Sequence, residues 1–243
     1  SEYQHNRAQA RGAHATPQGQ GPVRPVPVTQ GKRKRSGGVW RVVFIVSLIV
    51  FLCAAGALAF IGYGYWHGQQ NNKQLEQIGF NAPDASELQR TDLASFAVDW
   101  DALRAINPDV VGWIYVPGTT VNFPIVHGTD DEHYLKTDFY GQISWVSFGS
   151  IFLSAANAAD FSDANNIVYG HPMNDGSMFS PFADFGDADT FNGHRIVYVF
   201  TPTANYQLTT FSIVHCAADD PLAQTTFASE QERQAYVQDK VDR

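Results

Sequence analysis

The feature that most constrains this chain is an uninterrupted apolar run, Val42–Ile61. Its twenty residues carry no charge. At about 1.5 Å per residue, a helix of this length crosses a hydrocarbon core roughly 30 Å thick. Trp40 precedes the run, and Tyr63 and Trp66 follow it, as is typical of side chains at the two membrane interfaces. We therefore expect residues 42–61 to span a membrane, within an anchor that covers residues 39–66.

Charge is divided sharply along the chain. Residues 1–41 carry eight Lys/Arg and one acidic residue, whereas residues 42–243 carry eight Lys/Arg and twenty-three acidic residues. The basic cluster Lys32–Arg35 predicts a cytoplasmic N-terminus by the positive-inside rule. The acidic remainder is then expected outside the cell in a single-pass protein. Its charge argues against nucleic acid as a partner, because phosphate binding needs a basic face.

A cleavable signal peptide is the competing interpretation, with Ala57-Leu58-Ala59 as the cleavage site. The apolar run is longer than a usual signal-peptide core and a long segment precedes it, so an uncleaved anchor is favoured. Residues 1–38 are rich in Gln, Gly, Pro and Arg, which predicts a disordered basic tail. Residues 67–92 are predicted to form a stalk, in which Gln69–Gln77 has helical propensity.

Beyond the stalk, the pattern becomes that of a β-rich domain. A helix is predicted over Ser95–Ile106, since Phe96, Trp100 and Leu103 share one face, and Pro108 ends it. Short β-branched and aromatic runs follow, separated by Gly, Pro, Asn and Asp. They predict strands at Trp113–Val116, Asn122–Val126, Ser150–Leu153, Asn166–Tyr169, Arg195–Thr201 and Tyr206–Val214.

Strands of this length and spacing favour a β-barrel or a sandwich. The last two are predicted to form a hairpin through Pro202–Asn205. A capping box of Ser229 and Glu232 begins a final helix.

One histidine stands at a position suited to chemistry. His171 follows the predicted strand Asn166–Tyr169 after a single glycine, which places an imidazole at the rim of a sheet, where it can transfer protons near neutral pH. A hydrogen-bonded turn residue is the alternative. A metal site is not expected, because the loop group His127, Asp130, Asp131 and His133 has no established ligand spacing.

The residues around His171 resemble the histidine motif of class B sortases. Asn165–Phe179 fits that family's pattern Asn-x-Ile/Val-x-Tyr-Gly-His-x-Met-x-x-Gly-x-Met-Phe. Further family landmarks precede it in the right order, namely Asn107–Ile114, Pro117–Thr119, Pro124–Val126, Tyr134–Leu135 and Gly149–Leu153. Pro172 and Ser154 depart from the family, which more often has a polar residue and an aspartate there.

This resemblance implies a fold and an activity. The fold is mainly β, a sortase-type closed β-barrel with N-terminal helices and an inserted helix, formed by residues 93–243. The activity is that of a cysteine transpeptidase that needs no cofactor. A thiolate attacks the carbonyl after a threonine in the C-terminal sorting signal of a secreted protein. An amine from a cell-wall precursor or a pilin then resolves the thioacyl-enzyme.

The same resemblance gives His171 the role of proton donor and acceptor, and it implies a Gram-positive envelope. The family's nucleophile lies in a Thr-Leu-Ser-Thr-Cys strand after the helix that here begins at Ser229. Neither this strand nor the arginine that follows it occurs in residues 1–243. Cys216 precedes the helix in an unrelated context, and Arg195 and Arg233 match no catalytic arginine.

We therefore expect this chain to be a sortase fragment that stops before its nucleophile, with its C-terminal strands missing. Two other interpretations remain open. The chain is a natural, non-catalytic sortase-like binding protein anchored in the membrane, or it is an unrelated membrane-anchored β-domain such as an adhesin or a sensor.

Overall fold

The computed structural model describes residues 37–80, 82–83, 85–88, 92–144, 148–217 and 224–243. The predicted tail of residues 1–38 lies almost wholly outside this set. The chain divides into two compact units, Ser1–Ile49 and Val50–Arg243, and each is described by itself. The described part of the first unit is the beginning of helix α1.

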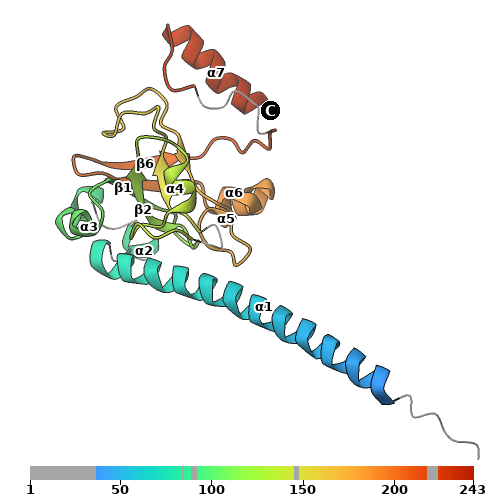
Figure 1. Ribbon diagram of the computed structural model, residues 1–243. Coiled ribbons are helices and arrows are strands. Elements are labelled where there is room, and N and C mark those ends of the chain that lie inside the picture. The colour runs from blue at the N-terminus through green and yellow to red at the C-terminus, as the bar shows by residue number, and fades with distance from the viewer. Residues whose placement is uncertain (1–36, 81, 84, 89–91, 145–147, 218–223) are drawn as a thin grey trace, which may run out of the picture. The chain divides into compact units, whose positions relative to one another are not determined.

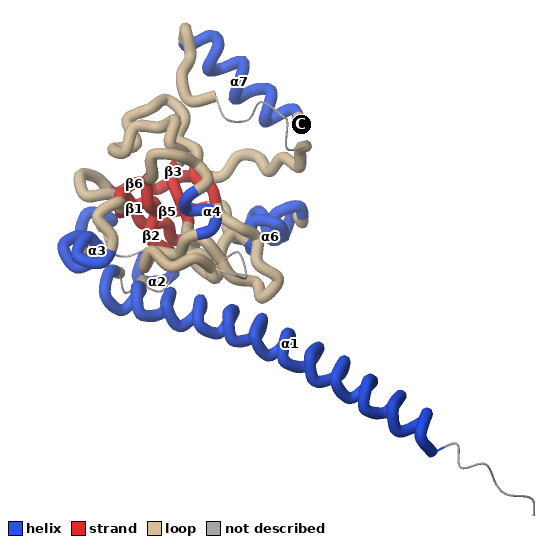
Figure 2. Tube along the Cα trace, in the orientation of Figure 1, coloured by secondary structure: helices blue, strands red, loops and turns tan. Residues whose placement is uncertain are grey.

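Helix α1 extends over Gly37–Gly79 (Figures 1 and 2). Among the described residues it is the one helix long and apolar enough to cross a membrane. Its side chains are exposed through the apolar run of residues 42–61, which agrees with the predicted membrane span. The helix continues through Gln69–Gln77 without a break, and Leu75 and Gly79 near its end are buried.

The second unit is built on one six-stranded sheet of order β4-β3-β2-β1-β5-β6. All neighbouring strands are antiparallel except β2 and β3, which are parallel. Figure 2 shows the strands gathered at the centre of this unit, with helices and loops around them. The strands are β1 Val110–Tyr115, β2 Asn122–His127, β3 Ile151–Leu153, β4 Val168–Tyr169, β5 Ile196–Phe200 and β6 Asn205–Thr209.

All six predicted strands are present, including the hairpin of β5 and β6. Its turn is closed by the Thr201 amide, which donates to the Ala204 carbonyl over 2.8 Å. The prediction for the last strand was too long, because β6 ends at Thr209 and not at Val214. Since β5 begins at Ile196, the chain beyond Thr210 has no further residue of β5 to pair with.

The helix predicted over Ser95–Ile106 begins later, at Trp100. Asp99 caps it by accepting the amide of Ala102 over 3.0 Å, and residues 93–95 form a separate 3₁₀ turn. The helices are α2 Ala85–Leu88, η1 Leu93–Ser95, α3 Trp100–Ile106, α4 His133–Lys136, α5 Ser180–Ala183, η2 Asp184–Gly186, α6 Ala188–Gly193 and α7 Glu230–Asp242.

The predicted capping box begins α7. Ser229 accepts the amide of Glu232 over 3.2 Å, and the Glu232 carboxylate accepts the amide of Ala228 over 2.7 Å. Only the Glu232 amide belongs to the first helical turn, and the second bond is displaced by one residue from a standard capping box, because it reaches the amide before the Ser229 cap.

Both faces of the sheet are buried. Successive residues of a strand point to opposite faces, and in β1 Trp113 packs into one apolar cluster while Ile114 packs into the other. The first cluster contains Leu75 from the end of α1 and Leu103 from α3. A Cβ on Gly79 would lie 2.8 Å from the methyl carbons of Leu103. The Leu103 side chain of α3 therefore packs directly against the backbone of α1.

Within the described residues the sheet is an open half-barrel, with β4 and β6 at its two edges. The resemblance predicts a closed barrel, and closure needs strands beyond those described. Edge β6 and the segment after it carry exposed apolar side chains. Leu208 is 47% exposed, and Phe211 and Ile213 beyond the strand are also exposed. Unpaired edge strands of this kind favour self-association.

We predict that Leu208→Lys reduces self-association of the 1–243 chain in detergent, because a charged side chain on an edge strand opposes strand pairing between molecules. Leu208 is exposed, so the free energy of unfolding should change by less than about 0.5 kcal/mol. Analytical ultracentrifugation measures the oligomer fraction. Val241→Lys on α7, also at an exposed residue, is the matched control. An equal reduction in both variants would show that net charge, and not the edge, is responsible.

Candidate active site

His171 lies just beyond the edge strand β4, as the sequence predicts. The strand pairs with β3 through Phe152 opposite Tyr169 and Leu153 opposite Val168. Only Gly170 separates β4 from the histidine, and the imidazole is half-buried. The backbone of His171 is therefore held by the sheet on one side, while its side chain remains partly accessible.

Gly170 is required by close packing. A Cβ at this position would lie 2.4 Å from Cδ1 of Ile151 and 2.6 Å from Cδ2 of Phe179, well inside van der Waals contact. The glycine therefore lets the chain pass between β3 and the segment after the histidine. This is the physical reason for glycine in the Tyr-Gly-His part of the motif.

A tight loop after His171 returns the chain to it. Pro172 and Met178 form an isolated antiparallel bridge, and the Phe179 amide donates to the His171 carbonyl over 3.0 Å. Gly176 within the loop has φ +80°, a conformation that glycine adopts without strain. The second half of the motif, residues 172–179, thus fixes the main chain of His171 through hydrogen bonds.

The segment before β4 is organised by two asparagines. Buried Asn157 donates to the Asn165 carbonyl over 2.8 Å and accepts the Ile167 amide over 2.9 Å. The side chain of Asn165 donates to the Gln224 carbonyl over 2.8 Å. The first residue of the histidine motif therefore contacts the segment that leads into α7.

The imidazole of His171 is oriented by helix α4. Its Nε2 atom lies 2.9 Å from the carbonyl oxygen of Leu135. Because a carbonyl oxygen only accepts hydrogen bonds, Nε2 must carry the proton in this arrangement. In the neutral imidazole, Nδ1 is then the basic nitrogen.

Helix α4 is held by a buried hydrogen-bond network that reaches the start of β1. The Tyr134 hydroxyl donates to the Asp109 carboxylate over 2.7 Å, and the Asn107 side chain donates to that hydroxyl over 3.2 Å. Burial, followed by the bond to Asp109, raises the pKa of Tyr134 to about 12. Tyr134 therefore stays a neutral donor at physiological pH.

The acidic residues of the loop before α4 have structural partners. Asp130 accepts the amides of Glu132 and His133, each over 2.8 Å. These two bonds hold the pKa of Asp130 below its usual 3.8. Asp131 accepts the Ser154 hydroxyl over 3.0 Å and the Ala155 amide over 2.6 Å.

The Asp131 contact was not predicted from the sequence. Ser154 stands where the family more often has an aspartate, and in this chain a carboxylate from a different loop reaches the same place. Burial raises the pKa of the nearby Tyr169 phenol, and Asp131 adds to that shift. No local motif signals this pairing, because the two residues are 23 positions apart.

One cysteine and two arginines remain as residues with reactive or charged side chains that the sequence analysis considered. Cys216 has a free, partly exposed thiol beyond β6. The Arg195 guanidinium donates twice to the Thr210 carbonyl, over 3.0 and 2.8 Å. Arg233 donates from Nε to Glu230 over 2.8 Å within α7. Both arginines are thus engaged in holding local structure.

Comparisons with known proteins identify relatives of this chain. No family model matches the sequence. The chain is 31% identical to sortase B of Staphylococcus aureus over 138 residues, which cover 57% of this chain and 56% of that protein. It is 28% identical to sortase B of Listeria monocytogenes over 193 residues, 77% of this chain and 76% of that protein.

A solved structure of an S. aureus sortase B–substrate complex superposes with a TM-score of 0.62 at 28% identity, covering 72% of this chain and 77% of that one. Fold and sequence thus both match sortases. A solved structure of Clostridium perfringens sortase B is 30% identical, with 58% of this chain and 77% of that one covered and a TM-score of 0.55. The chain therefore belongs to the class B sortase family. Its match spans little more than half of the staphylococcal protein.

We predict that Gly170→Ala destabilises the fold by about 1–3 kcal/mol, as expected for overpacking in a filled space. The added methyl group must displace Ile151 or Phe179, and with them the His171 backbone. Chemical denaturation of the full chain in detergent measures the loss. Gly193→Ala at the end of α6, where a Cβ meets nothing within 4 Å, is the control and should be nearly neutral. Equal stability of the two variants would contradict the packing role.

We also predict a pH dependence for the start of α4. The pKa of Asp130 is lowered in the folded protein, so its stabilising bonds are present above pH 3.8 and are lost as the pH falls through the lowered pKa. NMR shifts of the Glu132 and His133 amides should titrate with a midpoint below 3.8. In Asp130→Asn this titration should disappear. The same midpoint in the variant would assign it to another group.

Proposed function

We propose that this chain contributes the acid–base half of a membrane-anchored sortase-type transpeptidase. The single observation that supports this most strongly is His171 at the end of an edge strand, within a fully matched histidine motif. The similarity to a sortase B solved with its substrate supports a sorting-signal peptide as the partner. Membership of the class B family supports the same reaction type.

The proposed reaction is an exchange of one amide for another in two acyl transfers. A cysteine thiolate attacks the carbonyl after a threonine in the sorting signal, and the peptide C–N bond breaks as the thioester forms. The leaving amine takes a proton from His171 in its protonated state. An incoming amine of a cell-wall precursor or pilin then attacks the thioester, gives its proton back to His171, and releases the thiolate.

The orientation of His171 supports this role. The Leu135 carbonyl accepts from Nε2, so we assign proton exchange with substrate amines to Nδ1. The partly accessible position of the ring is compatible with proton transfer to a bound peptide. A structural histidine would instead be expected to have both ring nitrogens engaged inside the fold.

The proposed reaction needs a nucleophile that residues 1–243 do not supply in the family's form. The edge of β4 next to His171 is open in the described sheet, so a further strand has a place beside the histidine. Cys216 remains an unsuitable nucleophile under this proposal, because it lies in a segment beyond β6, which forms the opposite edge of the sheet.

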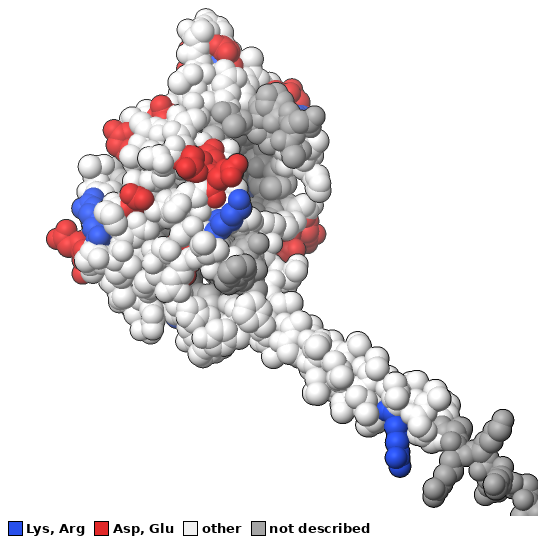
Figure 3. Space-filling view, in the orientation of Figure 1, with Lys and Arg blue, Asp and Glu red and all other residues white. Residues whose placement is uncertain are grey.

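The proposed location is the outer face of a membrane. Residues 42–61 would cross the bilayer, with the basic residues 1–41 in the cytoplasm. Acidic side chains predominate on the face of the protein seen in Figure 3, which agrees with a peptide or amine partner and not with a nucleic acid. The amine acceptor would come from the cell wall or from a pilin.

We predict that residues 1–243 alone do not cleave the peptide substrate of staphylococcal sortase B, with or without hydroxylamine as acceptor. A fusion of residues 1–243 to the C-terminal strands of the listerial relative should form the hydroxamate. Mass spectrometry of the peptide products measures both. Cleavage by the unfused chain would place a working nucleophile within residues 1–243 and overturn the assignment of Cys216.

In the active fusion, His171→Ala should lower kcat/KM by about 10²–10⁴-fold, the range expected for loss of a general acid–base group. His215→Ala, at an exposed histidine outside any strand or helix, is the control and should retain activity. Both variants should unfold at the same denaturant concentration as the parent. Near-normal turnover of His171→Ala would remove this residue from the mechanism.

The second candidate is a non-catalytic sortase-like binding protein. It rests on the similarity to a sortase B solved with its substrate, which supports peptide binding with or without turnover. It predicts that the unfused chain binds the sorting peptide reversibly and that the fusion gains no turnover. Fluorescence anisotropy of a labelled peptide, measured beside the cleavage assay, separates the two functions.

A further inference from the structure

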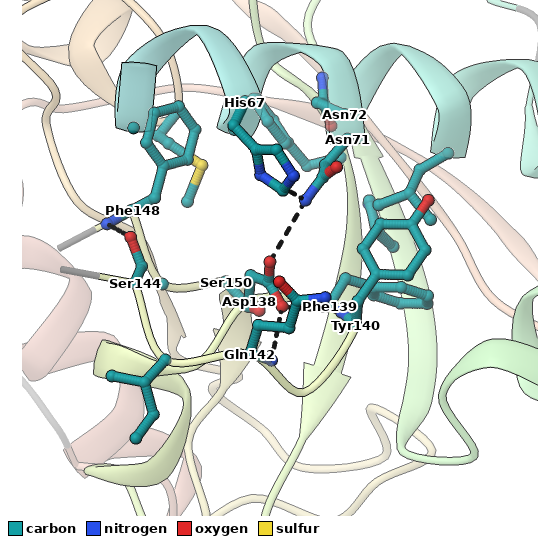
Figure 4. Close-up of a pocket in the computed structure, with 18 of the residues that line it drawn as sticks. His67, Asn71, Asn72, Asp138, Phe139, Tyr140, Gln142, Ser144, Phe148 and Ser150 are labelled. Carbon is teal, nitrogen blue, oxygen red and sulfur yellow. Dashed lines mark hydrogen bonds between the residues drawn. The ribbon is translucent and has the colours of Figure 1, made fainter. Parts of the chain in front are cut away.

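A cavity of about 290 Å³ lies between the second half of α1 and the segments around Asp138 and Ser150 (Figure 4), and His171 is not among its lining residues. One wall is a single face of α1, formed by Phe60, Gly64, His67, Asn71 and Leu75, which recur at helical spacing. From the first to the last of these residues the helix rises about 22 Å. The wall begins within the proposed membrane span and continues beyond it.

The opposite wall is mostly apolar and comes from the sheet and its loops. Phe123, Phe139, Phe148 and Met178 line it and are each buried. At the rim, apolar side chains remain open to solvent. Phe60 and Tyr63 are each 59% exposed, and Ile143 is 68% exposed. An apolar cavity with an exposed apolar rim marks a binding site for an apolar group.

Polar groups line the end of the cavity that is formed by the C-terminal part of α1. The Asn71 side chain lies 3.4 Å from His67 Nδ1 and donates to the Asp138 carboxylate over 3.3 Å (Figure 4). The amides of Tyr140 and Gln142 donate to the same carboxylate over 3.0 and 2.8 Å. Among the described residues that line the cavity there is one carboxylate and no lysine or arginine, so this lining is unsuited to a phosphate headgroup.

Two buried polar atoms in this lining have no hydrogen-bond partner in the described structure. They are Oδ1 of Asn72 and the hydroxyl of Tyr140. An unpaired buried polar atom costs roughly 1–3 kcal/mol. Oδ1 needs a donor, and burial together with the nearby Asp138 raises the pKa of the Tyr140 phenol, which therefore remains a neutral hydroxyl. An uncharged ligand hydroxyl has the chemistry that these atoms need, a donor for Oδ1 and an acceptor for the Tyr140 hydroxyl.

On the basis of the membrane anchoring proposed above, we propose that this cavity binds a diacylglycerol drawn from the outer leaflet. One acyl chain lies along the Phe60–Leu75 face of α1, and the free hydroxyl meets Asn72 and Tyr140. The wall of about 22 Å is longer than the roughly 15 Å that one leaflet contributes to the hydrocarbon core, so the whole of one acyl chain fits along it. The apolar rim lies nearer the membrane and the polar end farther away, so the lipid keeps its outer-leaflet orientation.

The test uses the full chain in phosphatidylcholine vesicles that contain a diacylglycerol with a photoreactive diazirine on one acyl chain. Flotation measures anchoring, and mass spectrometry locates cross-links after irradiation. We expect cross-links in residues 60–75 and 138–144, in addition to the span of residues 42–59. Excess unlabelled diacylglycerol should remove the cavity cross-links, whereas phosphatidylglycerol should not.

Two variants and a matched control test the assignment. Ile143→Asp places a charge at the rim and should lower the cavity cross-links about tenfold, because burying an unpaired carboxylate is unfavourable, while cross-links in the span stay unchanged. Ile78→Asp on α1, at an exposed residue outside the cavity lining, should behave as the parent. Tyr140→Phe should make unlabelled diacylglycerol a weaker competitor for the cavity cross-links. It should leave competition by the O-methyl ether of diacylglycerol unchanged, because the ether has no free hydroxyl.

The outcomes separate the two proposals. A chain that does not float with the vesicles overturns the anchoring and the lipid site together. A chain that floats but shows no cavity cross-links, or shows the same number in Ile143→Asp, overturns the lipid site alone. Displacement of the cross-links by an apolar peptide and not by diacylglycerol assigns the cavity to a peptide and also overturns it.

Discussion

The hydrogen bond between Nε2 of His171 and the Leu135 carbonyl is the interaction on which the rest of the site depends. It selects the imidazole tautomer, and it exists only because α4 is held in place. A single turn of helix such as α4 has little stability of its own. It is fixed by Asp130, which accepts two amides at its start, and by Tyr134, which reaches Asn107 and Asp109 just before β1.

The two-sided core explains why these distant segments meet. Because β1 buries Trp113 on one face and Ile114 on the other, helices and loops must cover both sides of the sheet. The end of α1 and α3 cover one face, while the loops around the histidine motif pack on the other. A sheet buried in this way cannot shift its register without exposing one complete set of apolar side chains, and this holds His171 at the strand end.

Local patterns predicted the strands, the final helix and the position of His171, because each depends on residues close together in the sequence. The Ser229–Glu232 capping box is an example, and so is the Tyr-Gly-His sequence at the end of β4. One of the missed features depends on a distant pair, and two have local causes. Helix α4 is too short for a periodic signal, and Asp131 meets Ser154 only after β2 and β3 have paired. The start of α3 was misplaced because the Asp99 cap competes with the apolar pattern that begins at Phe96.

The carboxylate of Asp131 shows how the site tolerates a departure from the family pattern. The family more often has an aspartate where this chain has Ser154, yet a negative charge still reaches that point from the loop before α4. Since the same loop carries the Asp130 cap, one short segment supplies both the charge and the helix that orients the imidazole. A change in this loop would therefore alter the Ser154 contact and the helix that orients the imidazole at once. The proposed acid–base residue thus depends as much on residues 130–135 as on its own motif.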